Sequence, residues 1–180
     1  MIYFTSDWHI GHNKPFIYEP RGFSSIEEHD KEVLKRCNEI VKPEDELWIL
    51  GDLAMSGAEK EWNIVYYSIQ CQNVHFIQGN HDTDNKVDKY IEEYKFEFHG
   101  YADILKYSKR RTFYLSHYPT IVGNFEDNKP SMWNLSGHTH SKDKFSIYPN
   151  VYNVSLDAHN CYPVSIETIY KDILKKEGKI

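Results

Sequence analysis

Two histidines, His138 and His140, stand one residue apart behind Gly137 in the segment LSGHTHS (135–141). Alternate residues of an extended chain point to the same side, so both imidazoles would face one site if this segment is strand-like. A His-x-His pair is a weak metal signal by itself, and a histidine-rich polar turn is the alternative. The other polar residues of the chain decide between these two interpretations.

Side chains of metal-ligand type also follow other apolar runs of the chain. The runs at 2–7, 46–52, 74–80, 112–117, 133–138 and 151–158 are predicted to be strands. In open α/β sheets, ligands bind beyond the carboxyl ends of the strands, so polar groups that follow several strands are expected to meet. The candidates at these ends are Asp7, His9, Asp52, Asn80, His117, His138 and His140.

The chemistry of this set favours divalent metal ions. It combines carboxylate and amide oxygens with imidazole nitrogens and contains no thiolate. Such ligands suit Mn²⁺, with Fe²⁺, Zn²⁺ and Ni²⁺ as alternatives, better than they suit a structural zinc site. The set is too large for one tetrahedral ion and is suitable for two ions that share a carboxylate. Two ions about 3.5–4 Å apart form a clamp for in-line displacement at phosphorus.

Five segments carry a family resemblance. SDWHIGH, LGDLAMSG, GNHD, LSHYP and SGHTH resemble, in this order, the motifs of the calcineurin-like metallophosphoesterases, over about residues 4–140. The resemblance implies an α/β fold of two mixed sheets packed face to face as a sandwich flanked by helices, in four layers. It also implies a first metal on Asp7, His9, Asp52 and His140, and a second on Asp52, Asn80, His117 and His138, with Asp52 as the bridge.

The resemblance further implies that His81 is a catalytic histidine that is not a metal ligand, acting beside Asp52 and Asn80. It would contact the phosphate or protonate the leaving oxygen. In the loop after the first strand, His12, Asn13 and Arg21 are candidates to contact a substrate phosphate. A solvated loop charge is the alternative for Arg21.

Two more polar residues follow the last predicted strand. Asp157 and His159 are candidates to line the rim of the site or to brace a ligand imidazole. The loop from Thr120 to Asn134 is the candidate substrate wall, and a loop packed on itself is the alternative. Its large apolar residues are Phe125, Met132 and Trp133.

The remaining histidines are predicted to have no catalytic role. Ser25 and Glu28 form a capping box in front of a helical apolar stripe, and His29 on that helix is expected to face solvent. His75 and His99 lie in or near strands, where structural histidines are expected.

Further elements complete the predicted α/β layout. A helix is expected after Ser56, another within 84–94, one or two strands within 96–112, and a strand or short helix before a frayed C-terminal tail. The buried face of the helix after Ser56 is expected to consist of Trp62, Val65, Tyr66 and Ile69.

Size and charge limit the classes of function. The chain has 180 residues, which suits a single domain over 1–180, and its net charge of −6 argues against binding long nucleic acid. Its apolar runs are too short for a membrane span, and its N-terminus does not resemble a signal peptide. The three cysteines form no framework, so a cytoplasmic location is expected. The oligomeric state is not predicted.

We therefore expect a two-metal phosphoesterase that hydrolyses a small phosphate ester, most simply a phosphodiesterase acting on a nucleotide-like diester. A phosphomonoesterase with the same metals is the alternative, followed by a metal-binding scaffold without activity. The segments GDLAMSG and GNHD differ from the GDxxDRG and GNHE patterns of phosphoprotein phosphatases, and the second motif lacks their phosphate-binding arginine. Phosphoprotein phosphatase activity is therefore disfavoured.

Overall fold

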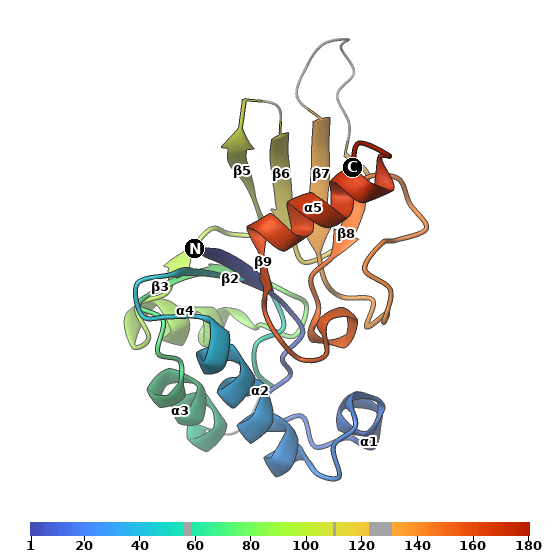
Figure 1. The fold of residues 1–180 in the computed structure, drawn as a ribbon. Helices are drawn as coiled ribbons and strands as arrows, with labels where there is room; N and C mark the ends of the chain where they lie inside the picture. The colour runs from blue at the N-terminus through green and yellow to red at the C-terminus, as the bar shows by residue number, and fades with distance from the viewer. Residues whose placement is uncertain (56–58, 110, 123–130) are drawn as a thin grey trace.

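The computed structural model describes residues 1–55, 59–109, 111–122 and 131–180, and contains two mixed β-sheets (Figure 1). The first sheet has the order β4-β3-β2-β1-β9, in which β1 to β4 are parallel and β9 is antiparallel to β1. Its strands are β1 (Ile2–Thr5), β2 (Glu46–Leu50), β3 (Asn73–Ile77), β4 (Glu97–Phe98) and β9 (Val164–Ser165).

The second sheet has the order β5-β6-β7-β8. Strand β5 is antiparallel to β6, whereas β6, β7 and β8 are parallel. Its strands are β5 (Ala102–Ser108), β6 (Arg111–Ser116), β7 (Ser131–Ser136) and β8 (Val151–Asn153). The predicted α/β fold with two mixed sheets is thus confirmed.

Helices α2, α3 and α4 lie along one face of the first sheet, and α5 crosses in front of the second sheet (Figure 1). The Ser25 hydroxyl caps α2 as predicted, because it accepts a hydrogen bond from the Glu28 amide at 3.2 Å. The helices are α1 (Pro15–Tyr18), α2 (Ile26–Ile40), α3 (Glu59–Ser68), α4 (Asp84–Glu92) and α5 (Ile166–Lys176), with short 3-10 turns η1 (Glu19–Arg21) and η2 (Leu156–His159).

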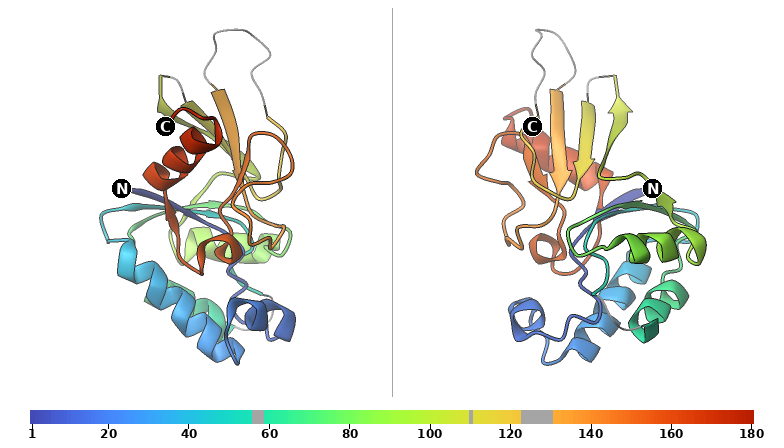
Figure 2. Two further views of the ribbon diagram at one scale, coloured as in Figure 1. Left: turned by 45° about the vertical axis from the view of Figure 1, so that its right-hand side comes forward. Right: turned by 180° about the vertical axis from the view of Figure 1, so that it is seen from behind.

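Strand β2 shows why the first sheet is apolar on both faces. Leu47 and Ile49 belong to the core under the helices, and the alternate residues Trp48 and Leu50 belong to a second core between the sheets. Two covered faces require a continuous apolar strand, which is the pattern of buried parallel sheets. Helix α5 adds its buried isoleucines to the second core, and the views from two further directions keep it beside the second sheet (Figure 2).

Several predicted boundaries are corrected by the structure. The predicted strands at 2–7, 46–52 and 74–80 end earlier, at Thr5, Leu50 and Ile77. The run at 151–158 is a strand only to Asn153 and continues into η2. Helix α1 and turn η1 were not predicted, because their short sequence shows no apolar periodicity.

The predicted substrate wall is also changed. Met132 and Trp133 lie in β7, and Trp133 is buried in the core between the sheets, so it cannot form a wall at the site. Phe125 lies outside the described residues. On α3, Val65 is buried as predicted and Ile69 packs against the core just after the helix, whereas the side chains of Trp62 and Tyr66 lie outside the described part.

Within the described residues, no helix is long and apolar enough to cross a membrane.

Candidate metal centre

The predicted ligands all lie in loops that follow strands β1, β2, β3, β6 and β7. These loops meet because the carboxyl ends of the parallel strands are brought to one place in each sheet. Hydrogen bonds then join the two sheets there. The Nδ1 atom of His117, after β6, lies 2.9 Å from the Leu50 carbonyl at the end of β2. The His138 amide, after β7, donates to the Asp7 carboxylate after β1 at 3.0 Å.

The ligand loops have an unusual backbone. Asp7, His9, Asp52, His138 and His140 have φ angles of 59°, 53°, 57°, 70° and 50°, in the left-handed region. This conformation costs a non-glycine residue about 1–2 kcal/mol and is typical of functional sites. The segment from Gly137 to His140 is therefore not strand-like, which corrects the extended geometry considered for it. The tight turns, rather than strand alternation, bring both histidines to the site.

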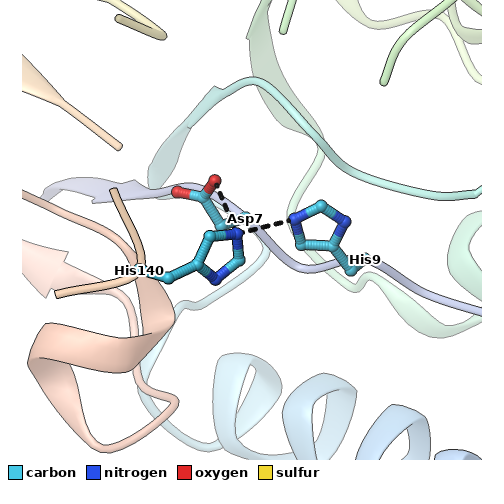
Figure 3. A group of neighbouring side chains, drawn as sticks. All are labelled: Asp7, His9 and His140. Atoms are coloured by element: carbon cyan, nitrogen blue, oxygen red, sulfur yellow. Dashed lines mark hydrogen bonds and ion pairs between the residues drawn. The ribbon is translucent and has the colours of Figure 1, made fainter. Parts of the chain in front are cut away.

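Asp7, His9 and His140 form the first group of ligands (Figure 3). The Nε2 atoms of His9 and His140 are 3.1 Å apart, and the His140 Nε2 lies 3.7 Å from the Asp7 carboxylate. The Asp7 carboxylate is held in place by the Ser6 hydroxyl at 2.7 Å and by the His138 amide at 3.0 Å. Three donor atoms thus converge within 4.8 Å of one another.

Asn80, His117 and His138 form the second group. The Asn80 Oδ1 atom lies 3.0 Å from both the His117 Nε2 and the His138 Nδ1. Asp52 lies between the two groups, because its Oδ2 atom is 3.7 Å from the His9 Nε2 and 3.4 Å from the His117 Nε2. One carboxylate therefore faces the ligands of both groups.

Two glycines make this close packing fit. A Cβ atom on Gly79 would lie 2.6 Å from the Asp52 amide nitrogen and in contact with the Asp52 carboxylate. A Cβ atom on Gly51 would lie 2.6 Å from the His117 Nδ1. Both contacts are shorter than any real Cβ contact. Glycine is therefore required wherever the backbone passes this close to a ligand.

The charges of the site also fit cations. Burial, together with the nearby His140, lowers the pKa of His9 to about 2, so its imidazole is neutral. Burial raises the pKa of Asp7. For Asp52 and His117, burial is outweighed by their mutual hydrogen bond, which leaves their pKa values at about 2 and about 9. Asp52 is therefore charged and is balanced by the proton on the His117 ring, and a divalent ion would replace that proton.

The donor set therefore fits two divalent ions that share Asp52. Comparison with known proteins agrees with this geometry, because the calcineurin-like phosphoesterase family matches residues 1–179. The chain belongs to this family. It is accordingly a metal-dependent phosphoesterase with a binuclear centre for divalent metals.

Similar proteins span the same length. An uncharacterized protein of Methanocaldococcus jannaschii is 30% identical over 99% of this chain and 93% of its own. The gene 66 protein of Mycobacterium phage L5 is 26% identical over 87% of this chain and 86% of its own. The solved structure of a protein of unknown function from Aquifex aeolicus, 22% identical, has a TM-score of 0.69 and covers 95% of this chain and 98% of that one. This last likeness concerns the fold alone.

His81 and His12 lie beside the first group of ligands of this phosphoesterase. A ring nitrogen of His81 lies within 4.8 Å of the ligand atoms of His9 and Asp52, and its amide donates to the Asp52 carboxylate at 2.8 Å. The Nδ1 atom of His12 is 3.4 Å from that of His9, and its ring packs edge-on against Phe16. Both imidazoles therefore lie where they could contact a molecule bound to the metal ions.

The other predicted substrate contacts are placed differently. Asn13 lines a separate groove beside α2. The Arg21 side chain is only 1% exposed, and its guanidinium donates to Asp157 at 2.7 and 3.0 Å and to the Asp7 carbonyl at 2.8 Å. These contacts favour a positioning role for Arg21 over binding of a phosphate.

A buried polar chain links Arg21 to two loops of the centre. Asp157 contacts the His140 Nδ1 at 3.0 Å, which is the bracing contact considered for it. On the other side, an Arg21 nitrogen lies 2.8 Å from the His29 ring, and His29 contacts Asp30 at 2.8 Å. The predicted exposure of His29 is wrong, because this side chain is fully buried. Its place on the apolar stripe of α2, three residues after Ile26, was the available signal.

His159 does not line the rim. Its Nε2 atom lies 2.8 Å from the Asn153 carbonyl, and its ring stacks on Tyr152, so it holds the turn after β8.

Asp82 is a positioning residue that the sequence interpretation missed. Its carboxylate accepts hydrogen bonds from the Asp52 amide at 2.6 Å and the Gly79 amide at 2.9 Å. It therefore ties the loop after β2 to the loop after β3. Burial raises the pKa of Asp82 to about 6. Its position at the end of GNHD, directly after His81, was the available signal.

Proposed function

We propose that the protein is a manganese-dependent phosphodiesterase that hydrolyses a small, nucleotide-like phosphodiester at a two-metal centre. The observation that carries this proposal is the position of Asp52, whose carboxylate lies between the His9 and His117 imidazoles. Mixed oxygen and nitrogen ligands suit Mn²⁺. Asp7, His9, Asp52 and His140 would hold one ion, and Asp52, Asn80, His117 and His138 the other.

When bound, two such ions polarise a phosphate ester and activate water for attack on phosphorus. The residues of the chain supply the remainder of the chemistry. The Leu50 carbonyl, 2.9 Å from the His117 Nδ1, holds this ring so that its Nε2 lone pair faces the site, and Asp157 does the same for His140. His81 would donate a proton to the leaving oxygen, which is supported by the position of its ring nitrogen within 4.8 Å of the ligand atoms of His9 and Asp52.

The charge around the site favours a diester. A phosphomonoester is a dianion near neutral pH and gains from a free guanidinium, whereas a diester carries one negative charge. In the described part of the chain, the guanidinium that contacts the centre is that of Arg21, and Asp157 already neutralises it. His12 would supply a neutral contact to a non-bridging oxygen, since burial and the neighbouring His81 lower its pKa.

The net charge of −6 supports a small substrate in preference to long nucleic acid. The three cysteines are buried free thiols, which supports a location in the reducing cytoplasm.

The test is hydrolysis of bis(p-nitrophenyl) phosphate beside p-nitrophenyl phosphate, with Mn²⁺ present or chelated. We expect manganese-dependent cleavage of the diester that Asp52→Asn reduces by at least about 100-fold, since the bridge serves both ions. The matched control is Asp88→Asn, which changes an exposed carboxylate on α4 and should leave the rate unchanged.

A monoester rate well above the diester rate would instead identify a phosphomonoesterase with the same centre. His81→Asn separates metal binding from catalysis, because it should retain both ions and lose turnover. Retention of full activity in this variant would refute the assignment of His81 as the proton donor.

A further inference from the structure

A second group of metal-type ligands lies at the β4 edge of the first sheet, apart from the candidate metal centre. His75 in β3 pairs in register with Glu97 in β4, and His99 follows two residues later. Alternate residues of a strand point to the same side, so the three side chains face the same way. The catalytic ligand that follows β3 is Asn80, beyond the end of this strand at Ile77.

The donor atoms of this group already stand at the separations of a coordination shell. The His75 Nδ1 lies 3.0 Å from the His99 Nε2 and 3.4 Å from the Glu97 carboxylate, and the His99 Nε2 lies 3.7 Å from the same carboxylate. Ligands on a tetrahedral zinc ion at about 2.0–2.1 Å are about 3.4 Å apart. An ion would therefore fit among them with little movement.

The opposite ring nitrogens are held by carboxylates. The His99 Nδ1 contacts Asp103 at 2.6 Å, and the His75 Nε2 faces Glu46 at 3.5 Å. With the ring protons on these outer nitrogens, the His75 Nδ1 and the His99 Nε2, 3.0 Å apart, would both present lone pairs to one ion. Carboxylates behind metal-binding histidines are the usual outer partners of zinc sites.

Trp48 fixes the orientation of both rings. Its indole stacks on His75 with centroids 4.4 Å apart and planes within 9°, and it packs against His99 at 4.6 Å. Both histidine side chains are 16% exposed, whereas Glu97 is 67% exposed. The rings are therefore preorganised, and the carboxylate closes the group from the solvent side.

The charge of the group is unbalanced without a cation. Three carboxylates, those of Glu46, Glu97 and Asp103, surround the two imidazoles. Within the described part of the chain, the ion-pair partners of Glu97 and Asp103 are these two histidines. A divalent ion would supply the missing positive charge.

We propose that His75, Glu97 and His99 form a separate structural site for a divalent cation of the zinc class. The ion would join β3 to β4 and, through Asp103 on β5, would tie the first sheet to the second. Water would complete its shell on the exposed side.

The test is titration of metal-free protein with Zn²⁺ by calorimetry. Loss of an outer-shell partner weakens zinc affinity by about 10- to 100-fold. Loss of a direct ligand should therefore weaken the affinity for one of the bound Zn²⁺ ions by more than about 100-fold. We expect this loss in Glu97→Gln and in His75→Gln, and wild-type binding in the control Glu93→Gln, which alters an exposed carboxylate after α4. Glu97→Gln keeps the test valid if His75→Gln does not fold, because Glu97 is largely exposed.

The same loss of one Zn²⁺ equivalent on Glu97→Gln is expected when both proteins also carry Asp52→Asn. In that background the bridging ligand of the catalytic centre is absent, so the loss cannot come from an ion that Asp52 binds. There, occupation of this site by Zn²⁺ at about 100 times its Kd should contribute about 5–10 °C to the Tm, and added Glu97→Gln should remove that contribution. Failure of the proposed phosphodiesterase function would leave this result untouched. Equal zinc binding by the wild type, Glu97→Gln and His75→Gln would show that His75 and His99 form a hydrogen-bonded pair without a metal ion, and would overturn the proposal.

Discussion

The contact between Asp157 and His140 gives a sharp test of how this centre is held. Asp157→Asn keeps the shape of the side chain and removes its charge. The carboxylate now contacts the His140 Nδ1 at 3.0 Å and accepts two hydrogen bonds from Arg21, at 2.7 and 3.0 Å. Burial would raise the pKa of Asp157, but the hydrogen bonds from His140 and Arg21 outweigh it and lower the pKa strongly. The side chain is therefore charged at neutral pH.

The magnitude follows from these contacts. Loss of a carboxylate behind a metal-binding histidine weakens metal affinity by about 10- to 100-fold, or about 1.4–2.8 kcal/mol. The buried guanidinium of Arg21 also loses its counter-charge, since its side chain is 1% exposed and that of Asp157 is 6% exposed. Breaking a buried pair costs about 3–5 kcal/mol, and an Asn oxygen that still accepts one hydrogen bond reduces the cost to about 2–3 kcal/mol.

The assay is calorimetric titration of the folded variant with Mn²⁺, together with urea unfolding. Asp143→Asn is the control, because its carboxylate is exposed in the loop before β8. We expect one Mn²⁺ equivalent to bind at least tenfold more weakly in Asp157→Asn and normally in the control. Wild-type Mn²⁺ affinity in a destabilised Asp157→Asn protein would show that Asp157 serves the fold alone, and the reasoning about His140 would be refuted.

Two further predictions concern packing and pH. Gly79→Ala would place its Cβ 2.6 Å from the Asp52 amide, and such overpacking should cost about 1–3 kcal/mol of unfolding free energy and weaken Mn²⁺ binding in calorimetry. Gly100→Ala, where a Cβ meets nothing within 4 Å but φ is 71°, should cost about 1 kcal/mol of unfolding free energy through backbone strain and leave Mn²⁺ binding unchanged. Glu177 accepts from Arg111 at 2.9 and 3.0 Å, which lowers its pKa to about 2. Because a lowered pKa stabilises the fold above the unfolded value of about 4.5, Glu177→Gln should cost about 2 kcal/mol at pH 7. In urea unfolding of metal-free protein this cost should shrink by pH 3, as the wild type loses the contribution on approaching pH 2, and a cost equal at both pH values would contradict the assignment.

The pattern of apolar runs predicted the strands of the first sheet well, since a strand covered on both faces must be apolar throughout. Leu47 to Leu50 illustrate this, with alternate residues in two different cores. The same pattern extended the strands too far into the ligand loops. Apolar character does not report the point at which Asp7 or Asp52 enters the left-handed region, because those backbone angles depend on contacts from other strands.

The sequence by itself determined the family, the kinds of ligand and their place after the strands, because residue types and short motifs fix this chemistry locally. The family resemblance also implied which ligands share an ion and that Asp52 is the bridge. Tertiary structure decided the distances from Asp52 to His9 and His117, and that Arg21 is bound to Asp157. It also buried His29 and brought His75 to His99 across 24 residues. These contacts join residues far apart in the chain, and their distances depend on how two sheets pack, which no local pattern of residues encodes.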